Sequence, residues 1–241
     1  MSRDSLDFSI QEAGSLLYVA DVSFGGHPIN EFHEFFGGRG GLKDLTERSA
    51  VMAGSLYQDD GYNVRIVFGE LDDEEASEWT SSISGSLNVG SGRMIVSGVC
   101  DDGLEGHIAD FPPAENGGDY ELGTIVDVEP GTYSVSIYSF PPNDLAGGWM
   151  RLIDKGFFKR TLWQTQGIDF EKPLAYFERT RPGESVPQWI AEGWDEQDFL
   201  DFVIQLGPAR TTQASQKFED DGCLEWQYRK PEKCPKGIVL G

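Results

Sequence analysis

The chain has 241 residues, 41 of them acidic and 19 basic, and a formal net charge of −22 at pH 7. Such acidity disfavours approach to DNA, RNA or anionic lipid, and it attracts cations or basic proteins. A hydrophobic fraction of 39%, with six Trp, eight Tyr and fifteen Phe, excludes a disordered acidic tail and indicates a substantial core.

The first third of the chain predicts two strands and a short helix. Residues 16–22 are nearly all apolar and indicate an early strand before a Gly-Gly turn. A helix is expected at about 43–53. Residues 63–68 alternate apolar and polar side chains, which is typical of a strand with one buried face. The candidate core residues of the predicted helix are Leu42, Leu45 and Met52.

Two hairpins are predicted in the middle of the chain. The first joins residues 86–89 to 93–99 through a Gly-Ser-Gly turn, and the second joins 124–128 to 132–138 through Glu-Pro-Gly. Between them, residues 101–122 form a long acidic loop rich in Gly and Pro, and loops of that length are usually functional or mobile.

The last third mixes aromatic and basic residues with further elements. Residues 145–158 are expected to be partly helical, and 174–179 and 224–229 predict strands. The strongest helix candidate is 194–206, which Asp195 caps and a Gly-Pro pair ends. For residues 201–206 alone a strand remains an alternative, because β-branched residues lie at their centre.

Short strands, Gly/Pro turns and one or two helices predict an α+β fold that is predominantly antiparallel β and resembles a β-sandwich. A single β-rich domain over residues 1–241 is expected, with a possible subdomain boundary near 141–145. The polar, acidic start Met1–Ser5 shows no secretory signal, and no apolar run is long enough to cross a bilayer. We therefore expect a cytoplasmic protein without a membrane association.

No residue set argues for catalysis, for a metal or for a cofactor. The three cysteines lack CxxC spacing, although Cys223 and Cys234 could pair in an exported protein. His27 and His33 with nearby carboxylates match no known zinc spacing, and neither 59–61 nor 101–105 matches the calcium-binding ladder. Cys100 and His107 make a weak candidate for a nucleophilic pair.

The acids are concentrated in one stretch. Between Ile66 and Met150 there are sixteen acids and one base, a net of −15, against −5 for residues 1–65 and −2 for residues 151–241. We predict that this stretch supplies a partner-binding surface, with two aromatic anchors of the kind that interface hot spots favour. The predicted acidic residues are Glu70, Asp72, Asp73, Glu74, Glu75, Glu78, Asp101, Asp102 and Glu105, and the aromatic anchors are Trp79 and Tyr120.

The favoured hypothesis is a soluble acidic protein that captures a basic protein, most concretely an immunity or inhibitor protein for a nucleic-acid-cleaving toxin. A nuclease presents a basic cleft to phosphate, and an acidic surface would shield it. Two alternatives remain: a small hydrolase or carbohydrate-binding sandwich with an aromatic platform, possibly dependent on calcium, and an acidity that reflects adaptation to high salt.

Overall fold

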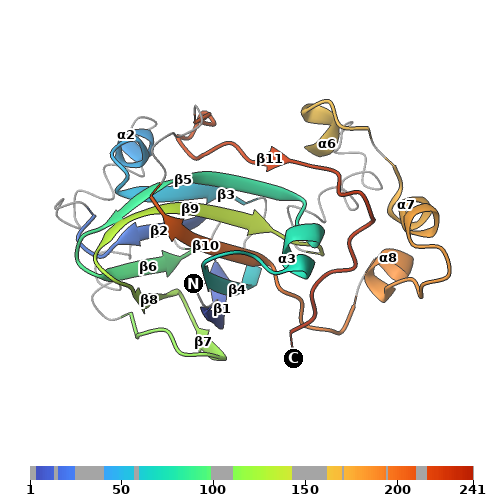
Figure 1. The fold of residues 1–241 in the computed structure, drawn as a ribbon, viewed down its shortest axis with the longest axis horizontal. Helices are drawn as coiled ribbons and strands as arrows, with labels where there is room; N and C mark the ends of the chain where they lie inside the picture. The colour runs from blue at the N-terminus through green and yellow to red at the C-terminus, as the bar shows by residue number, and fades with distance from the viewer. Residues whose placement is uncertain are drawn as a thin grey trace.

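The structure is a computed structural model that describes residues 4–13, 16–24, 41–56, 60–98, 111–142, 162–169, 171–193, 195–209 and 216–240. Two β-sheets pack face to face and helices gather at two ends of the molecule (Figure 1). The larger sheet, sheet A, has the strand order β11-β5-β9-β10-β4-β1-β7, and it is mixed because β10 and β7 run parallel to their neighbours β4 and β1. Its strands are β1 (Asp4–Ala13), β4 (Asp60–Phe68), β5 (Ser81–Val89), β7 (Gly118–Tyr120), β9 (Gly131–Ser139), β10 (Phe202–Pro208) and β11 (Gln227–Tyr228).

Sheet B is antiparallel throughout and has the order β3-β2-β6-β8. Its strands are β2 (Leu16–Asp21), β3 (Val51–Ser55), β6 (Arg93–Ser97) and β8 (Gly123–Asp127). The predicted α+β, mostly antiparallel sandwich is therefore confirmed. The two strands expected at 16–22 and 63–68 correspond to β2 and β4.

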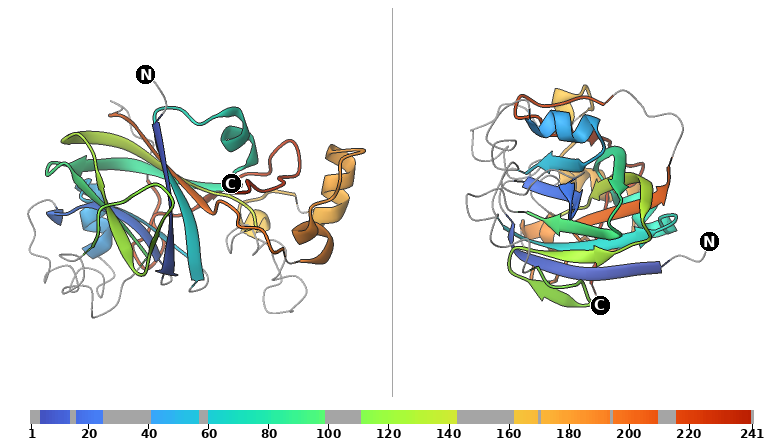
Figure 2. Two further views of the ribbon diagram at one scale, coloured as in Figure 1. Left: turned by 90° about the horizontal axis from the view of Figure 1, so that it is seen from below. Right: turned by 90° about the vertical axis from the view of Figure 1, so that its left-hand side faces the viewer.

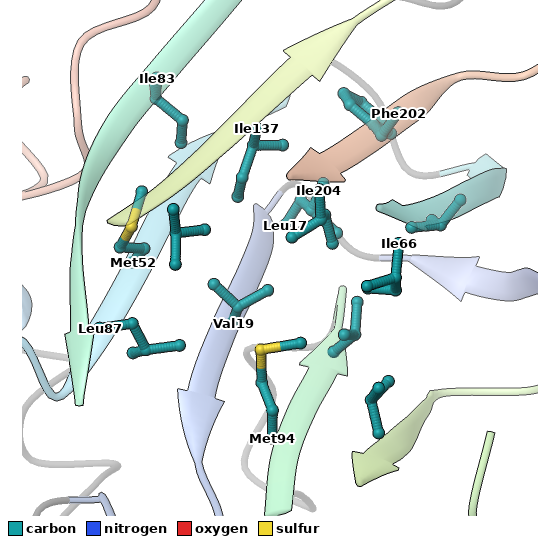
Figure 3. Packing of buried hydrophobic residues seen from close by; sticks show 14 of the residues in the cluster. Leu17, Val19, Met52, Ile66, Ile83, Leu87, Met94, Ile137, Phe202 and Ile204 are labelled. Atoms are coloured by element: carbon teal, nitrogen blue, oxygen red, sulfur yellow. The ribbon is translucent and has the colours of Figure 1, made fainter. Parts of the chain in front are cut away.

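The main core lies between the two sheets (Figure 3). Sheet A contributes side chains such as Ile66, Ile137 and Ile204, and sheet B contributes Val19 and Met94. A second cluster covers the other face of sheet B, where helix α2 (Gly41–Glu47) packs Leu42 and Leu45 against it. Because sheet B is covered on both faces, all six residues of β2 are buried.

The two predicted hairpins are wrong. Strand β5 pairs with β9 in sheet A, whereas β6 pairs with β8 in sheet B, so each of the two short connections carries the chain from one sheet to the other. The two connections lie against each other, since the Val128 amide donates to the Gly92 carbonyl at 2.9 Å. A hairpin and a corner between sheets share a short turn and alternating strands, and only the long-range partners distinguish them.

Two other predictions exchange helix for strand. Residues 174–179 belong to helix α7 (Pro173–Thr180), in which Pro173 takes the first helical position and the adjacent Tyr176 and Phe177 are both buried in one cluster. A strand would send these two side chains to opposite faces. Within 194–206, the strand alternative is correct: β10 buries Phe202 and Ile204 in the main core and Val203 on the opposite face. The late strand is shorter than expected and is limited to β11.

The outer face of sheet A is covered at one end by a cluster that includes Val67, Val203 and Ile238, and the C-terminal residues contribute to it. In Figure 1 the segment that follows β11 runs between the sheets and helices α7 and α8. The described helices are short and more numerous than the one or two expected. Beside α2 and α7 they are α3 (Asp73–Glu78), α6 (Leu162–Thr165) and α8 (Gln188–Glu192). Within the described residues no helix is long and apolar enough to span a bilayer.

The terminal strands of both sheets are short or partly covered in the described structure. Sheet A ends in β11 and in β7, which have two and three residues. At the edges of sheet B, the Leu224 amide donates to the Ala53 carbonyl of β3 at 2.9 Å, and the Ala114 amide donates to the Ile125 carbonyl of β8 at 2.7 Å. The single-domain boundaries remain a prediction. The chain does return to sheet A as β10, beyond the proposed boundary at 141–145.

Candidate partner-binding surface

The acidic run 70–78 forms helix α3 and its N-terminal cap. The Asp72 side chain accepts a hydrogen bond from the Glu75 amide at 2.8 Å, and the Glu75 carboxylate accepts one from the Asp72 amide at 3.1 Å. This capping box satisfies two amides that a helix start would otherwise leave without a partner. Acids in the first turn also favour the helix dipole, so part of this run is explained by the helix itself.

Glu75 is not part of an exposed surface, contrary to the prediction. Glu75 is 0% exposed, and its carboxylate pairs with the guanidinium of Arg65 in β4 at 3.1 Å. Arg65 also contacts Asp7 of β1 at 2.6 Å, and these hydrogen bonds raise the pKa of the guanidinium. Glu75 therefore fastens α3 to sheet A, and burial makes it unavailable to a partner.

Glu78 is internal in the same way. It is 4% exposed, its Oε1 pairs with Arg181 at 2.7 Å, and its Oε2 accepts hydrogen bonds from the amides of Lys236 and Gly237. Burial raises the pKa of this carboxyl, and these donors act in the opposite direction. One side chain thus joins α3, the segment after α7 and the C-terminal segment.

The two predicted aromatic anchors are also engaged within the chain. Trp79 is half-buried between the Arg229 guanidinium, 3.5 Å from its ring centroid, and the ring of Tyr138 at 5.2 Å. The Tyr120 hydroxyl accepts from the Glu115 amide at 2.7 Å, and its ring packs edge-on against Phe8. Neither ring is an exposed side chain that a partner could bury whole.

One exposed acid of the run, Glu74, lies at a groove. Glu70, Asp73 and Glu74 are exposed, and Asp72 is half-buried. The groove has a volume of about 420 Å³ and brings together Glu74 of α3, the start of α8, the stretch 195–199 and the C-terminal segment. Its full lining is Glu74, Pro187, Gln188, Asp195, Gln197, Phe199, Lys236, Gly237, Ile238 and Val239.

Asp195 and its neighbours were missed as site residues because the sequence assigned 194–206 to a helix. In the structure, Asp195 accepts a hydrogen bond from the Gln197 amide in a turn, and Glu196 and Asp198 are exposed beside it. The signal available was a second cluster of four acids within residues 195–201. This cluster did not stand out because residues 151–241 as a whole have a net charge of only −2.

The remaining predicted site residues, Asp101, Asp102 and Glu105, lie outside the described residues. So do His27, His33, His107, Cys100 and Asp59. Among the described residues no group of three or more His, Cys, Asp or Glu side chains is arranged to hold a metal ion. Cys223 and Cys234 are not joined by a disulfide; they are buried in two different clusters.

The aromatic platform of the carbohydrate-binding alternative has no counterpart in the described part of the chain. Trp189 and Trp226 are 2% and 1% exposed, and the large hydrophobic side chains that are exposed there are Leu174 and Val239. The described geometry therefore offers a groove lined by two carboxylates and by apolar side chains, and no large aromatic side chain is fully exposed among the described residues.

No family model and no curated protein matches this sequence. Among solved structures, the chain is similar to one described as "Crocagin biosynthetic gene J", with 14% identity, a TM-score of 0.45 and coverage of 87% of this chain and 100% of that one. It is also similar to ComJ from Bacillus subtilis, described as an inhibitor of the DNA degrading activity of NucA, with 6% identity, a TM-score of 0.38 and the same coverage. Likenesses this distant carry no conclusion about the function of this chain.

Proposed function

We propose that this protein captures a basic protein partner through the acidic groove, and most concretely that it is an inhibitor or immunity protein for a nucleic-acid-cleaving toxin. The observation that carries the proposal is the meeting of acids from two distant parts of the sequence, Glu74 and Asp195, at one groove. Acidic side chains that serve only to keep a surface hydrated need not lie together at a concave site.

The charge of this surface is not cancelled within the described structure. No described basic side chain pairs with Asp73, Glu74, Glu196 or Asp198. Lys236 lines the groove, and its ammonium is 3.3 Å from the Glu184 carboxylate. Mutual repulsion of unpaired acids costs stability, so their retention at one groove supports a role in attracting a cationic partner.

A nuclease is the partner class that fits this chemistry best. Such an enzyme needs a cationic cleft to hold phosphate, and that cleft is the complement of an acidic groove. The same field repels nucleic acid, so the protein would compete with the substrate of the nuclease without binding it. Steered association of this kind is fast at low salt and slows as ions screen the charges.

A pull-down from the native lysate at about 50 mM and about 500 mM salt tests the proposal, because the Debye length falls severalfold over this range. We expect one stoichiometric basic protein at low salt that is released at high salt. The captured protein should cleave nucleic acid, and the purified acidic protein should inhibit it.

Two charge-matched variants locate the surface. Glu74→Lys with Asp195→Lys alters the groove, whereas Asp127→Lys with Glu129→Lys makes the same change in net charge at the exposed corner before β9. That corner lies at the opposite end of the β5–β9 pair from α3. Capture should be lost in the first variant and retained in the second. Equal capture by both variants, or no stoichiometric partner at either salt, would contradict the proposal.

A further inference from the structure

We propose that the groove binds the side chain of one arginine of the basic partner. This inference rests on the proposed function and specifies how the partner is anchored. Three features carry it: polar side chains of the lining, an apolar part of the same lining, and a backbone frame that joins the segments around the groove. We call the polar lining residues Glu74, Gln188, Asp195 and Gln197 the rim, and the apolar lining residues Phe199, Ile238 and Val239 the floor. In Figure 2, α3, α8 and the C-terminus lie toward the same end of the sheets, and residues from these three parts of the chain line the groove.

The rim supplies an uncompensated negative charge. Glu74 and Asp195 come from different elements, and the one basic residue of the lining, Lys236, is neutralised by Glu184 at 3.3 Å. Burial is the largest single effect on the pKa of Glu184 and raises it, but the hydrogen bond from Lys236 and the charges of Lys236, Arg181 and Lys233 together outweigh burial and lower the pKa, so the carboxylate stays charged near neutral pH. The groove therefore favours a cation over an anion or a neutral side chain.

The floor suits an alkyl stem and a flat cationic group. Phe199, Ile238 and Val239 line the groove, and Val239 is 51% exposed, one of two exposed large hydrophobic residues among those described. Long basic side chains bury their methylene groups on apolar surface while the charged end meets a carboxylate. Covering Val239 in this way removes apolar surface from water, which an exposed acidic patch alone would not do.

Hydrogen bonds within the chain join the segments that form the groove. The Leu200 amide donates to the Ile238 carbonyl at 2.8 Å and the Leu240 amide to the Asp198 carbonyl at 2.9 Å, so residues 198–200 and 238–240 lie side by side. The indole of Trp189 donates to the Lys236 carbonyl at 2.8 Å. When the segments of a site are already joined, little binding free energy is lost to ordering them.

Arginine fits better than lysine because the rim offers acceptors in several directions. Gln188 and Gln197 line the groove together with Asp195, and each side-chain amide has a carbonyl oxygen that can accept a hydrogen bond. The Gln188 amide nitrogen donates to Glu192 at 3.0 Å. A planar guanidinium has five N–H donors and is weakly hydrated, so it satisfies acceptors on both sides while it lies flat on the floor. A lysine ammonium is compact and strongly hydrated.

The test is a titration of the full chain with N-acetyl-arginine amide, N-acetyl-lysine amide and N-acetyl-citrulline amide, followed by the backbone amide NMR signals of Phe199, Gly237 and Val239. Citrulline has the shape of arginine without its charge. We expect arginine to shift these signals with a dissociation constant in the millimolar range, at least about fivefold tighter than lysine, and citrulline to leave them unchanged.

Two isosteric variants and a control locate the site. Glu74→Gln and Asp195→Asn should each raise the dissociation constant for N-acetyl-arginine amide by about fivefold. Asp127→Asn, at the far corner, should leave this constant unchanged. Equal shifts by arginine and lysine, or an unchanged titration in both groove variants, would overturn the proposal. If the titration fails and the pull-down still depends on Glu74 and Asp195, capture stands without the arginine anchor. If the pull-down also fails, the proposed function is lost as well.

Discussion

The guanidinium carbon of Arg229 lies over the ring of Trp79, 3.5 Å from its centroid. Arg229 also donates hydrogen bonds of 2.8 Å to the carbonyls of Trp79 and Ala76, at the end of α3. Burial lowers the pKa of this guanidinium to about 10, which leaves it charged at neutral pH. A residue from the C-terminal segment thus satisfies carbonyl groups at the C-terminal end of α3, the helix that contains most of the acidic run.

Replacing Arg229 should therefore loosen α3. We expect Arg229→Ala to lower the free energy of unfolding by about 2–3 kcal/mol through loss of the cation–π contact and two charged hydrogen bonds. Arg229→Lys keeps the charge but not the planar fork, and it should lose about half as much. Urea unfolding at pH 7 measures both. An alanine variant as stable as the wild type would show that Arg229 does not hold α3.

The Glu78–Arg181 pair gives a sharper distinction between internal and exposed acids. Glu78→Ala leaves Arg181, whose side chain is 10% exposed, without its buried partner, and should cost about 3–5 kcal/mol. Glu78→Gln keeps an acceptor for the Lys236 and Gly237 amides and should cost less. Asp73→Ala, at an exposed position of the same helix, should change the stability by no more than about 0.5 kcal/mol. Equal losses for Glu78→Ala and Asp73→Ala in thermal unfolding would contradict these assignments.

Asp21 should contribute to the pH dependence of stability. Burial raises its pKa, but hydrogen bonds from the amides and hydroxyls of Ser23 and Ser91 outweigh burial and lower it below its ordinary value of 3.8. A group with a lowered pKa in the folded state contributes stability above its unfolded pKa, and this contribution is lost as the pH falls through the folded value.

The variant Asp21→Asn should therefore be less stable than the wild type at pH 7, and the two should converge as the pH falls below about 4. Urea midpoints between pH 7 and pH 3 measure this difference. A constant gap across the whole range would mean that the charge of Asp21 does not stabilise the fold.

Because the two connections between the sheets contact each other at Gly92, alanine substitutions at Gly92 and Gly90 should differ in their effect on stability. Gly92 has φ +76°, and an added Cβ would lie 3.1 Å from the Val128 carbonyl oxygen. We expect Gly92→Ala to cost about 1–2 kcal/mol because of the left-handed backbone and this close approach. Gly90 has nothing within 4 Å of such a Cβ, so Gly90→Ala serves as the control and should change stability by less than about 0.5 kcal/mol. Similar losses at both positions would contradict this account of the corner.

The sequence predicted the fold class and most strands, because alternation of apolar residues reports which faces are buried. It did not predict the pairing of β5 with β9 and of β6 with β8, since a turn such as 90–92 looks the same in a hairpin and in a corner between sheets. It preferred a helix over β10 because a strand buried on both faces loses its alternation, as Val203 shows.

The candidate site was predictable only in part. Composition identified an acidic surface, and Glu74 does lie at the groove. The Asp-x-x-Glu spacing of a capping box separates Glu75 from Glu74 in the sequence, but it does not reveal that Glu75 also pairs with Arg65 inside the protein while Glu74 is exposed. Asp195 joins Glu74 only through the packing of α8 and the C-terminal segment, which are more than a hundred residues from α3 in the sequence.

The covered edges of both sheets decide how this protein can meet another one. A long open strand invites an extended segment to add to the sheet through backbone hydrogen bonds, and such pairing is largely indifferent to sequence. Here β7 and β11 are too short for that, and the described edges of β3 and β8 already receive amides from Leu224 and Ala114. At these four terminal strands recognition therefore falls to side chains, so a partner that docks there is selected by its own charges and shape.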